Sequence, residues 1–179
     1  MKKYVVRLCT AIIVLTAIDQ LVKYIINMFF FQTVVTIIPG ILTFRPVHNT
    51  DLSWFGSLGL QIFANYYVTV IFNLLIFSLA IILYRYLYVN MGVSGKLTQI
   101  IFIFLFAAIL CSTIDRIFWT GSIDYIRLKG FFTFDIKDCY MTAFIILFIG
   151  SYFKYQKEWN RFSVKELIKA LTGEADSSQ

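Results

Sequence analysis

The hydrophobic positions of the chain fall into four long runs, separated by segments in which polar and charged residues return. Because a helix needs about 20 residues to cross the hydrocarbon core of a bilayer, we predict spans at about 4–27, 64–88, 97–118 and 138–156. The composition agrees, since 59% of the residues are hydrophobic and the mean hydropathy is +0.77. A soluble domain contains about 45–50% apolar residues. The pattern therefore predicts an integral membrane protein that is mainly α-helical.

The first run resembles a secretory signal peptide, because Lys2, Lys3 and Arg7 precede its apolar residues. However, Asp19 and Lys23 interrupt the run, and no small-x-small cleavage motif follows it. We expect this segment to remain as the first membrane span.

Positive charges predict the orientation of the spans. With both termini in the cytoplasm, ten Lys and Arg residues lie inside and six outside, which satisfies the positive-inside rule. The net charge of +6 is then an orientation signal and a contact with anionic lipid, and a nucleic-acid partner is excluded. We expect a multi-pass membrane protein, N-in and C-in.

Residues 29–62 form the largest outer segment. The β-branched and aromatic stretches TVVTII and ILTF flank Pro39-Gly40, which predicts a hairpin in a small extracytoplasmic β-element. We expect this element to lie on the membrane surface, anchored by aromatic side chains, namely Phe29, Phe30, Phe31, Trp54 and Phe55.

The chain divides into a four-span domain, 1–158, and a cytoplasmic tail, 159–179. In the tail, Ser163 and Glu166 have the spacing of a capping box before a short amphipathic helix. The three cysteines form no CxxC pair, and His48, which we expect in a loop, cannot build a zinc site alone. We therefore predict no metal and no cofactor.

The six aspartates outside the tail all fall on the predicted outer side of the membrane. Asp19 and Lys23 are four residues apart on one helix, so they share a face and can neutralise each other. Asp115 and Arg116 close the third span. For these four residues a structural ion pair explains the sequence at least as well as direct chemistry.

Asp124 and Asp138 suggest catalysis more directly. Asp124 follows the third span, and Asp138 begins the fourth, where the helix N-terminus favours a carboxylate. If the two spans are neighbours, the acids can meet and share a proton, so that one activates water while the other donates to a carbonyl. N-capping and solvation in a loop would explain the same acids, and the residues alone leave these alternatives open.

Five segments, spread in order along residues 4–156, resemble the lipoprotein signal peptidase, or signal peptidase II, family. IDQLVKY at 18–24 resembles the family's Asp-x-x-x-Lys motif, and FRPVHNT at 44–50 resembles the segment with a functional asparagine, here Asn49. STIDR at 112–116 resembles Asn-x-x-Asp-Arg. SIDYI and FDIKD resemble the two stretches that hold the catalytic aspartates, here Asp124 and Asp138.

The chain also departs from the family pattern. Ser112 and Asp135 stand at positions of asparagine, Lys137 replaces a small residue, and TDLSWFG follows Asn49 in place of a small-residue run. Lys137 could act on the neighbouring carboxylates, but we expect its side chain to reach lipid headgroups. These changes affect the expected substrate preference more than the expected reaction.

The resemblance implies an intramembrane aspartyl endopeptidase that removes the signal peptide of a diacylglyceryl-modified prolipoprotein, cutting before the lipidated cysteine. Its catalytic residues would be Asp124 and Asp138. Supporting residues would be Asp19, Lys23, Asn49, Ser112, Asp115, Arg116 and Asp135. It would act as a monomer in the lipid of the bacterial plasma membrane, with its active site at the extracytoplasmic face and without a cofactor. Two alternatives remain: a non-catalytic protein that binds lipidated peptides, and a small cation or proton carrier.

Overall fold

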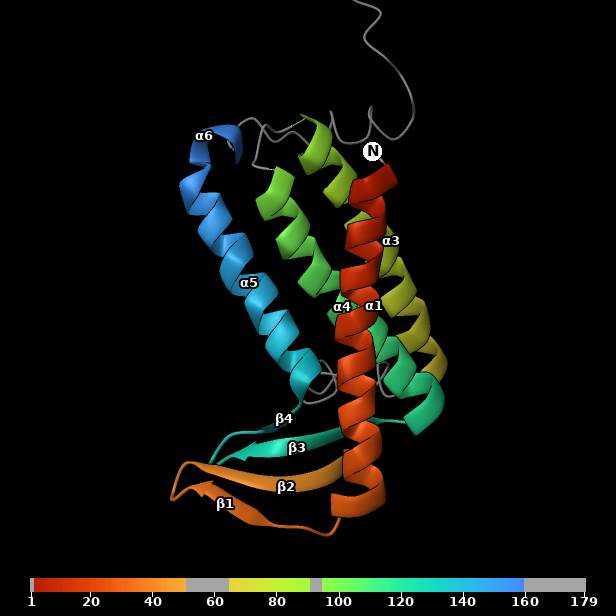
Figure 1. The fold of residues 1–179 in the computed structure, drawn as a ribbon, viewed down its shortest axis with the longest axis vertical. Helices are drawn as coiled ribbons and strands as arrows, with labels where there is room; N and C mark the ends of the chain where they lie inside the picture. The colour runs from red at the N-terminus through yellow and green to blue at the C-terminus, as the bar shows by residue number, and fades with distance from the viewer. Residues whose placement is uncertain (1, 51–64, 91–94, 160–179) are drawn as a thin grey trace, which may run out of the picture.

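The computed structural model describes residues 2–50, 65–90 and 95–159. Four long helices form a bundle: α1 (Lys2–Ile25), α3 (Tyr66–Asn90), α4 (Gly95–Trp119) and α5 (Ile136–Lys154) (Figure 1). A π-helical turn, η1 (Ile26–Phe30), prolongs α1, and a short helix, α6 (Gln156–Trp159), follows α5. All four long helices are apolar enough to cross a membrane. The four predicted spans are confirmed, with ends that shift by a few residues.

Helix α4 lies at the centre of the bundle and contacts α1, α3 and α5. Half of its most apolar window is buried inside the protein, against 11–17% for the other three helices. Small side chains at Ala107, Ala108 and Cys111 let neighbouring helices approach it closely, as is usual where helices pack in lipid. The outer helices expose Leu, Ile and Phe side chains because their solvent there is lipid.

An antiparallel sheet closes one end of the bundle, with strand order β1-β2-β3-β4 (Figure 1). Its strands are β1 (Val35–Ile38), β2 (Leu42–Asn49), β3 (Ser122–Leu128) and β4 (Thr133–Phe134). The predicted hairpin is confirmed as β1 and β2, with Gly40 in the turn at φ 78°. The pairing of β3 with β2 was not predicted, because the stretch SIDYI was interpreted only as an apolar patch after a span. His48 lies in β2, so its expected place in a loop is wrong.

Several sequence-based expectations lie outside the described residues. They concern the interfacial anchors Trp54 and Phe55 and the amphipathic helix of the tail beyond residue 159. Of the other proposed anchors, Phe29 and Phe30 have exposed side chains at the end of the first span.

Gly121 controls how closely the start of β3 approaches the end of β2. A Cβ atom at this position would lie 2.7 Å from the backbone oxygen of Asn49 and 3.1 Å from Nε2 of His48. Gly121→Ala should therefore push the strands apart and lower the free energy of unfolding by about 1–3 kcal/mol, as is usual for overpacking. The unfolding temperature in detergent measures this loss.

Gly150→Ala in α5 is the matched control, because a Cβ atom there meets nothing within 4 Å. Equal unfolding temperatures for the two variants would show that the close approach at Gly121 is not needed.

Candidate active site

Five aspartates from different elements converge where the sheet meets the helices. Asp19 belongs to α1, Asp115 to the last turns of α4, and Asp124 to β3. Asp135 is the N-cap of α5, and Asp138 lies in its first turn. Residues far apart in the sequence thus share one site, which explains why the chain keeps these acids at the ends of its apolar segments.

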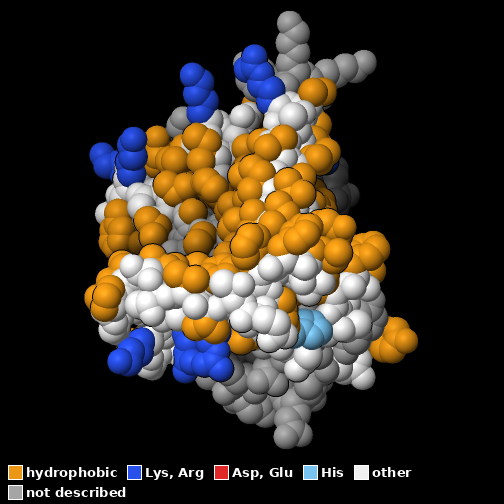
Figure 2. Space-filling model, turned by 60° about the horizontal axis from the view of Figure 1, so that its bottom comes forward, with side chains coloured by type: hydrophobic (Ala, Val, Ile, Leu, Met, Phe, Trp, Pro, Cys, Tyr) orange, Lys and Arg blue, Asp and Glu red, His pale blue; other side chains and the backbone are white. Residues whose placement is uncertain are grey.

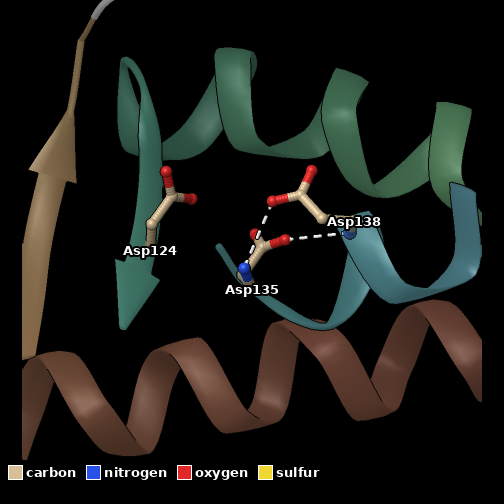
Figure 3. Close-up of side chains that lie close together, drawn as sticks. All are labelled: Asp124, Asp135 and Asp138. Carbon is tan, nitrogen blue, oxygen red and sulfur yellow. Dashed lines mark hydrogen bonds between the residues drawn. The ribbon is translucent and has the colours of Figure 1, made fainter. Parts of the chain in front are cut away.

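Asp124 and Asp138 face one another across the gap between β3 and α5 (Figure 3). Carboxylate oxygens of Asp124, Asp135 and Asp138 all lie within 4.8 Å of one another. Asp124 is only 3% exposed, and its Oδ2 accepts a 2.7 Å hydrogen bond from Nδ2 of Asn49. The register of β2 against β3 places Asn49 opposite Ser122. Asp124 lies two residues further along β3, so its side chain is on the same face of the strand as that of Ser122.

A capping box fixes Asp135 and Asp138 relative to each other. The backbone N–H of Asp138 donates to Oδ1 of Asp135 at 3.1 Å, and the N–H of Asp135 donates to Oδ2 of Asp138 at 3.2 Å (Figure 3). Each carboxylate thus satisfies a donor that the start of a helix otherwise leaves unpaired. One oxygen of Asp138 is used in this way, and it is the oxygen on the side of Asp124 (Figure 3).

Lys23 joins three of the acids in the buried part of the site. Its Nζ lies 2.8 Å from Asp19, 2.7 Å from Asp115 and 2.7 Å from Asp135, and its side chain is fully buried. The expected pairing with Asp19 is confirmed, but Lys23 also connects α1 to α4 and to the start of α5. Removing either the cation or one of its carboxylates is costly, because it leaves a buried charge without its counter-charge.

Lys137 does not reach toward lipid headgroups, so that expectation is wrong. Its Nζ contacts Asp135 and lies 2.6 Å from Oγ of Ser122, 3.3 Å from Asp115 and 3.5 Å from Asp124. Its backbone N–H donates to Oδ1 of Asp19 at 3.1 Å. The carboxylates attract the ammonium group more strongly than solvent or lipid does, because they are nearly buried and in excess.

Ser122 and Gln20 belong to the site but were not predicted from the sequence. Ser122 Oγ lies 2.7 Å from Asp124, 3.3 Å from Asp115 and 3.2 Å from Asp135. A strand at this segment would have indicated it, because residues two apart on a strand share a face. Gln20 donates to Asp19 and Asp115, and its oxygen accepts from Nε1 of Trp119.

Two expected supporting residues contribute from the edge of the site. Ser112, one turn before Asp115 on α4, accepts a 3.2 Å hydrogen bond from Nδ2 of Asn73. Arg116 is buried and interacts electrostatically with Asp115 and Asp124. Ser112 therefore joins α4 to α3, while Arg116 adds positive charge near the carboxylates.

The charge of Asp135 is stabilised by its cations. Burial opposes ionisation of its carboxyl group, but Lys137 and Lys23 outweigh burial, so the pKa of Asp135 lies below its ordinary value. Three carboxylates this close could in principle hold a cation. We assign no metal to them, because Lys23 and Lys137 already supply positive charge at Asp135, and Lys137 supplies it at Asp124.

Asp135 should make the stability of the protein depend on pH. Because its pKa is lowered by folding, its contribution is complete above about pH 5 and is lost as the pH falls through the lowered value. Asp135→Asn keeps an N-cap acceptor but removes the charge. The variant should unfold at a lower temperature at pH 7, with a difference from the native protein that shrinks toward pH 3. A difference that is independent of pH would contradict this role.

Comparisons with known proteins agree with this fold. A family model described as Signal peptidase (SPase) II, Peptidase_A8, matches residues 11–154. No curated protein matches the sequence significantly. Two solved structures, each described as a bacterial membrane enzyme, share the fold at 23% identity, with TM-scores of 0.64 and 0.61. The first match covers 88% of this chain and 94% of the other, and the second covers 80% and 90%.

The family model spans most of the chain, including both helices and the strand that hold Asp115, Asp124 and Asp138. From this match we conclude that the chain belongs to the signal peptidase II family, whose members are aspartyl peptidases that cleave lipoprotein signal peptides.

Proposed function

We propose that Asp124 and Asp138 are the catalytic dyad of this peptidase. The observation that supports this most strongly is their approach to within 4.8 Å from two different elements, at a site where hydrogen bonds hold both carboxylates. Two carboxylates at this distance cannot both ionise cheaply, so the pair shares a proton.

The shared proton gives the two acids opposite roles. The ionised carboxylate takes a proton from a water molecule as that water attacks the scissile carbonyl, and the protonated one donates to the carbonyl oxygen. When the tetrahedral intermediate collapses, the first acid gives its proton to the leaving amine and the second acid takes one back from a hydroxyl of the intermediate, so that the dyad again holds a single proton. Asn49 and the capping box hold the carboxyl groups in place, so that little reorganisation is needed during the reaction.

The substrate that fits this chemistry is a prolipoprotein with a diacylglyceryl-modified cysteine, cut just before that residue. On the face shown in Figure 2, hydrophobic side chains form a belt between Lys and Arg side chains at the two ends. None of the described acidic side chains reaches the surface on that face. Such a belt suits a bilayer, in which the signal helix could lie against the spans and the acyl chains remain in lipid.

The orientation we propose is N-in and C-in in a bacterial plasma membrane, with the sheet and the dyad at the outer face. The Lys and Arg bias along the sequence supports it. Asp19, Lys23, Asn49, Ser112, Asp115, Arg116 and Asp135 then support the dyad from the bundle and the sheet.

A gel-shift assay tests the function. Purified protein in detergent receives a prolipoprotein that already contains the diacylglyceryl group, and the same prolipoprotein without the lipid serves as the control substrate. We expect a faster-migrating product from the lipidated substrate alone. Failure to process a lipidated substrate that another signal peptidase II cleaves would contradict the proposal. Binding without cleavage would instead support a peptide-binding protein.

A further inference from the structure

We propose that Lys137 is a positioning residue, a built-in counter-ion that sets the pH range in which the dyad holds a single proton. The inference rests on the proposed roles of Asp124 and Asp138. It assigns to Lys137 a task different from that of Lys23, although both ammonium groups contact Asp115 and Asp135.

The two lysines occupy different depths in the site. Lys23 is fully buried and contacts Asp19, Asp115 and Asp135, none of which belongs to the dyad. The Lys137 side chain is 15% exposed, and its Nζ also lies 3.5 Å from Oδ1 of Asp124. Of the two cations, Lys137 is therefore the one that acts directly on a member of the dyad.

Ser122 gives Lys137 a second route to Asp124. Nζ of Lys137 donates to Oγ of Ser122 at 2.6 Å, and Oγ of Ser122 lies 2.7 Å from Oδ1 of Asp124. A hydroxyl has one proton to donate. Because the ammonium group donates to this oxygen, the hydroxyl proton is directed toward a carboxylate, and Asp124 is the nearest one. The cation thus acts on Asp124 both through space and through Ser122.

The other charges around Lys137 determine the size of its effect. They are Asp115 and Arg116 from α4, Asp124 from β3, Asp135 at the N-cap, Asp138 on the same helix, and Asp19 and Lys23 from α1. These five carboxylates outnumber the cations, which are three when Lys137 itself is counted, so mutual repulsion favours additional protonation. Removing the Lys137 charge should strengthen this tendency, and the dyad would then lose its protons at a higher pH.

The pH profile of kcat/KM for signal-peptide removal tests this prediction. We expect both limbs of the native bell-shaped profile to move upward by about 1–3 pH units in Lys137→Met and in Lys137→Gln. Glutamine can still donate to Ser122, so its effect isolates the charge from the hydrogen bond. Lys137→Arg should keep the native position of the profile, and so should Lys129→Met, which removes an exposed lysine from the turn after β3.

A loss of rate with unchanged limbs in both neutral variants would overturn the proposal, because a purely structural role predicts that result. A second measurement does not depend on turnover. Infrared spectroscopy follows the protonated carboxyl band of the native protein and of Lys137→Gln, and Asp124→Asn and Asp138→Asn identify the part of the band that the dyad supplies. We expect that part to titrate at higher pH in Lys137→Gln, and an unchanged titration would reject the counter-ion role.

The two measurements also separate this proposal from the proposed function. A native protein that cleaves no lipidated substrate but shows the shifted titration would retain the Lys137 inference and reject the peptidase assignment. A protein that cleaves the lipidated substrate, with the same pH profile in the native form and in the Lys137 variants, would retain the peptidase assignment and reject the Lys137 inference.

Discussion

Asp124→Asn and Asp138→Asn are each expected to lower the rate of signal-peptide removal by about 10³- to 10⁴-fold, because each removes one half of a proton-transfer pair. Asparagine has nearly the shape of aspartate, and its oxygen can still accept the hydrogen bond from Asn49 or from the N–H of Asp135. It cannot take a proton from water or share one with its partner. The loss should therefore appear in kcat with little change in substrate binding.

Gel shift and unfolding temperature, measured together, provide the test. Both variants should unfold within a few degrees of the native protein, since the capping box and the contact with Asn49 survive in them. Substantial cleavage by either variant would show that the substituted aspartate is not a member of the catalytic dyad. A strongly lowered unfolding temperature would show that the lost activity reflects folding instead.

Lys23→Met is expected to have the largest effect on stability. It replaces a fully buried ammonium group that contacts three buried carboxylates, and it leaves those carboxylates with much less positive charge nearby. Breaking a buried ion pair from one side usually costs about 3–5 kcal/mol of unfolding free energy. Because Lys23 connects α1 to α4 and to the start of α5, the loss should also reduce activity by loosening the site.

A fluorescent thiol probe can measure this loss in detergent once the exposed Cys9 and Cys139 are replaced by serine, since Cys111 is fully buried and the probe reaches it only when the protein unfolds. Lys129→Met is the matched control, because Lys129 is exposed and belongs to no ion pair among the described residues. Similar unfolding temperatures for the two variants would mean that Lys23 contributes little beyond its packing. A lower unfolding temperature in Lys23→Met alone would confirm the structural role.

The local patterns of the sequence determined much of the architecture. Spans were predictable because, in lipid, each segment must satisfy its own backbone hydrogen bonds, and only a long apolar helix does so simply. The β1–β2 hairpin was predictable from β-branched residues around Pro39-Gly40, and the pairing of Asp19 with Lys23 from their four-residue spacing. These features depend on neighbours within one or two turns of chain.

The contacts that assemble the site join residues that are far apart in the sequence. Lys23 meets Asp115 across 92 residues, and Asn49 meets Asp124 across 75. Packing of α1 against α4 produces the first contact, and pairing of β3 with β2 produces the second. No local pattern specifies either. For the same reason Ser122 was missed, and Lys137 was expected to point outward.

The sequence by itself thus determined a four-span membrane protein with its acids at the ends of the spans, and the family resemblance indicated which two of them to examine. Only the tertiary structure decided how those charges are paired. A buried charge must find its counter-charge within a few ångströms. Which cation is that close depends on helix packing and strand register, so Lys23 serves the buried acids while Lys137 reaches the dyad.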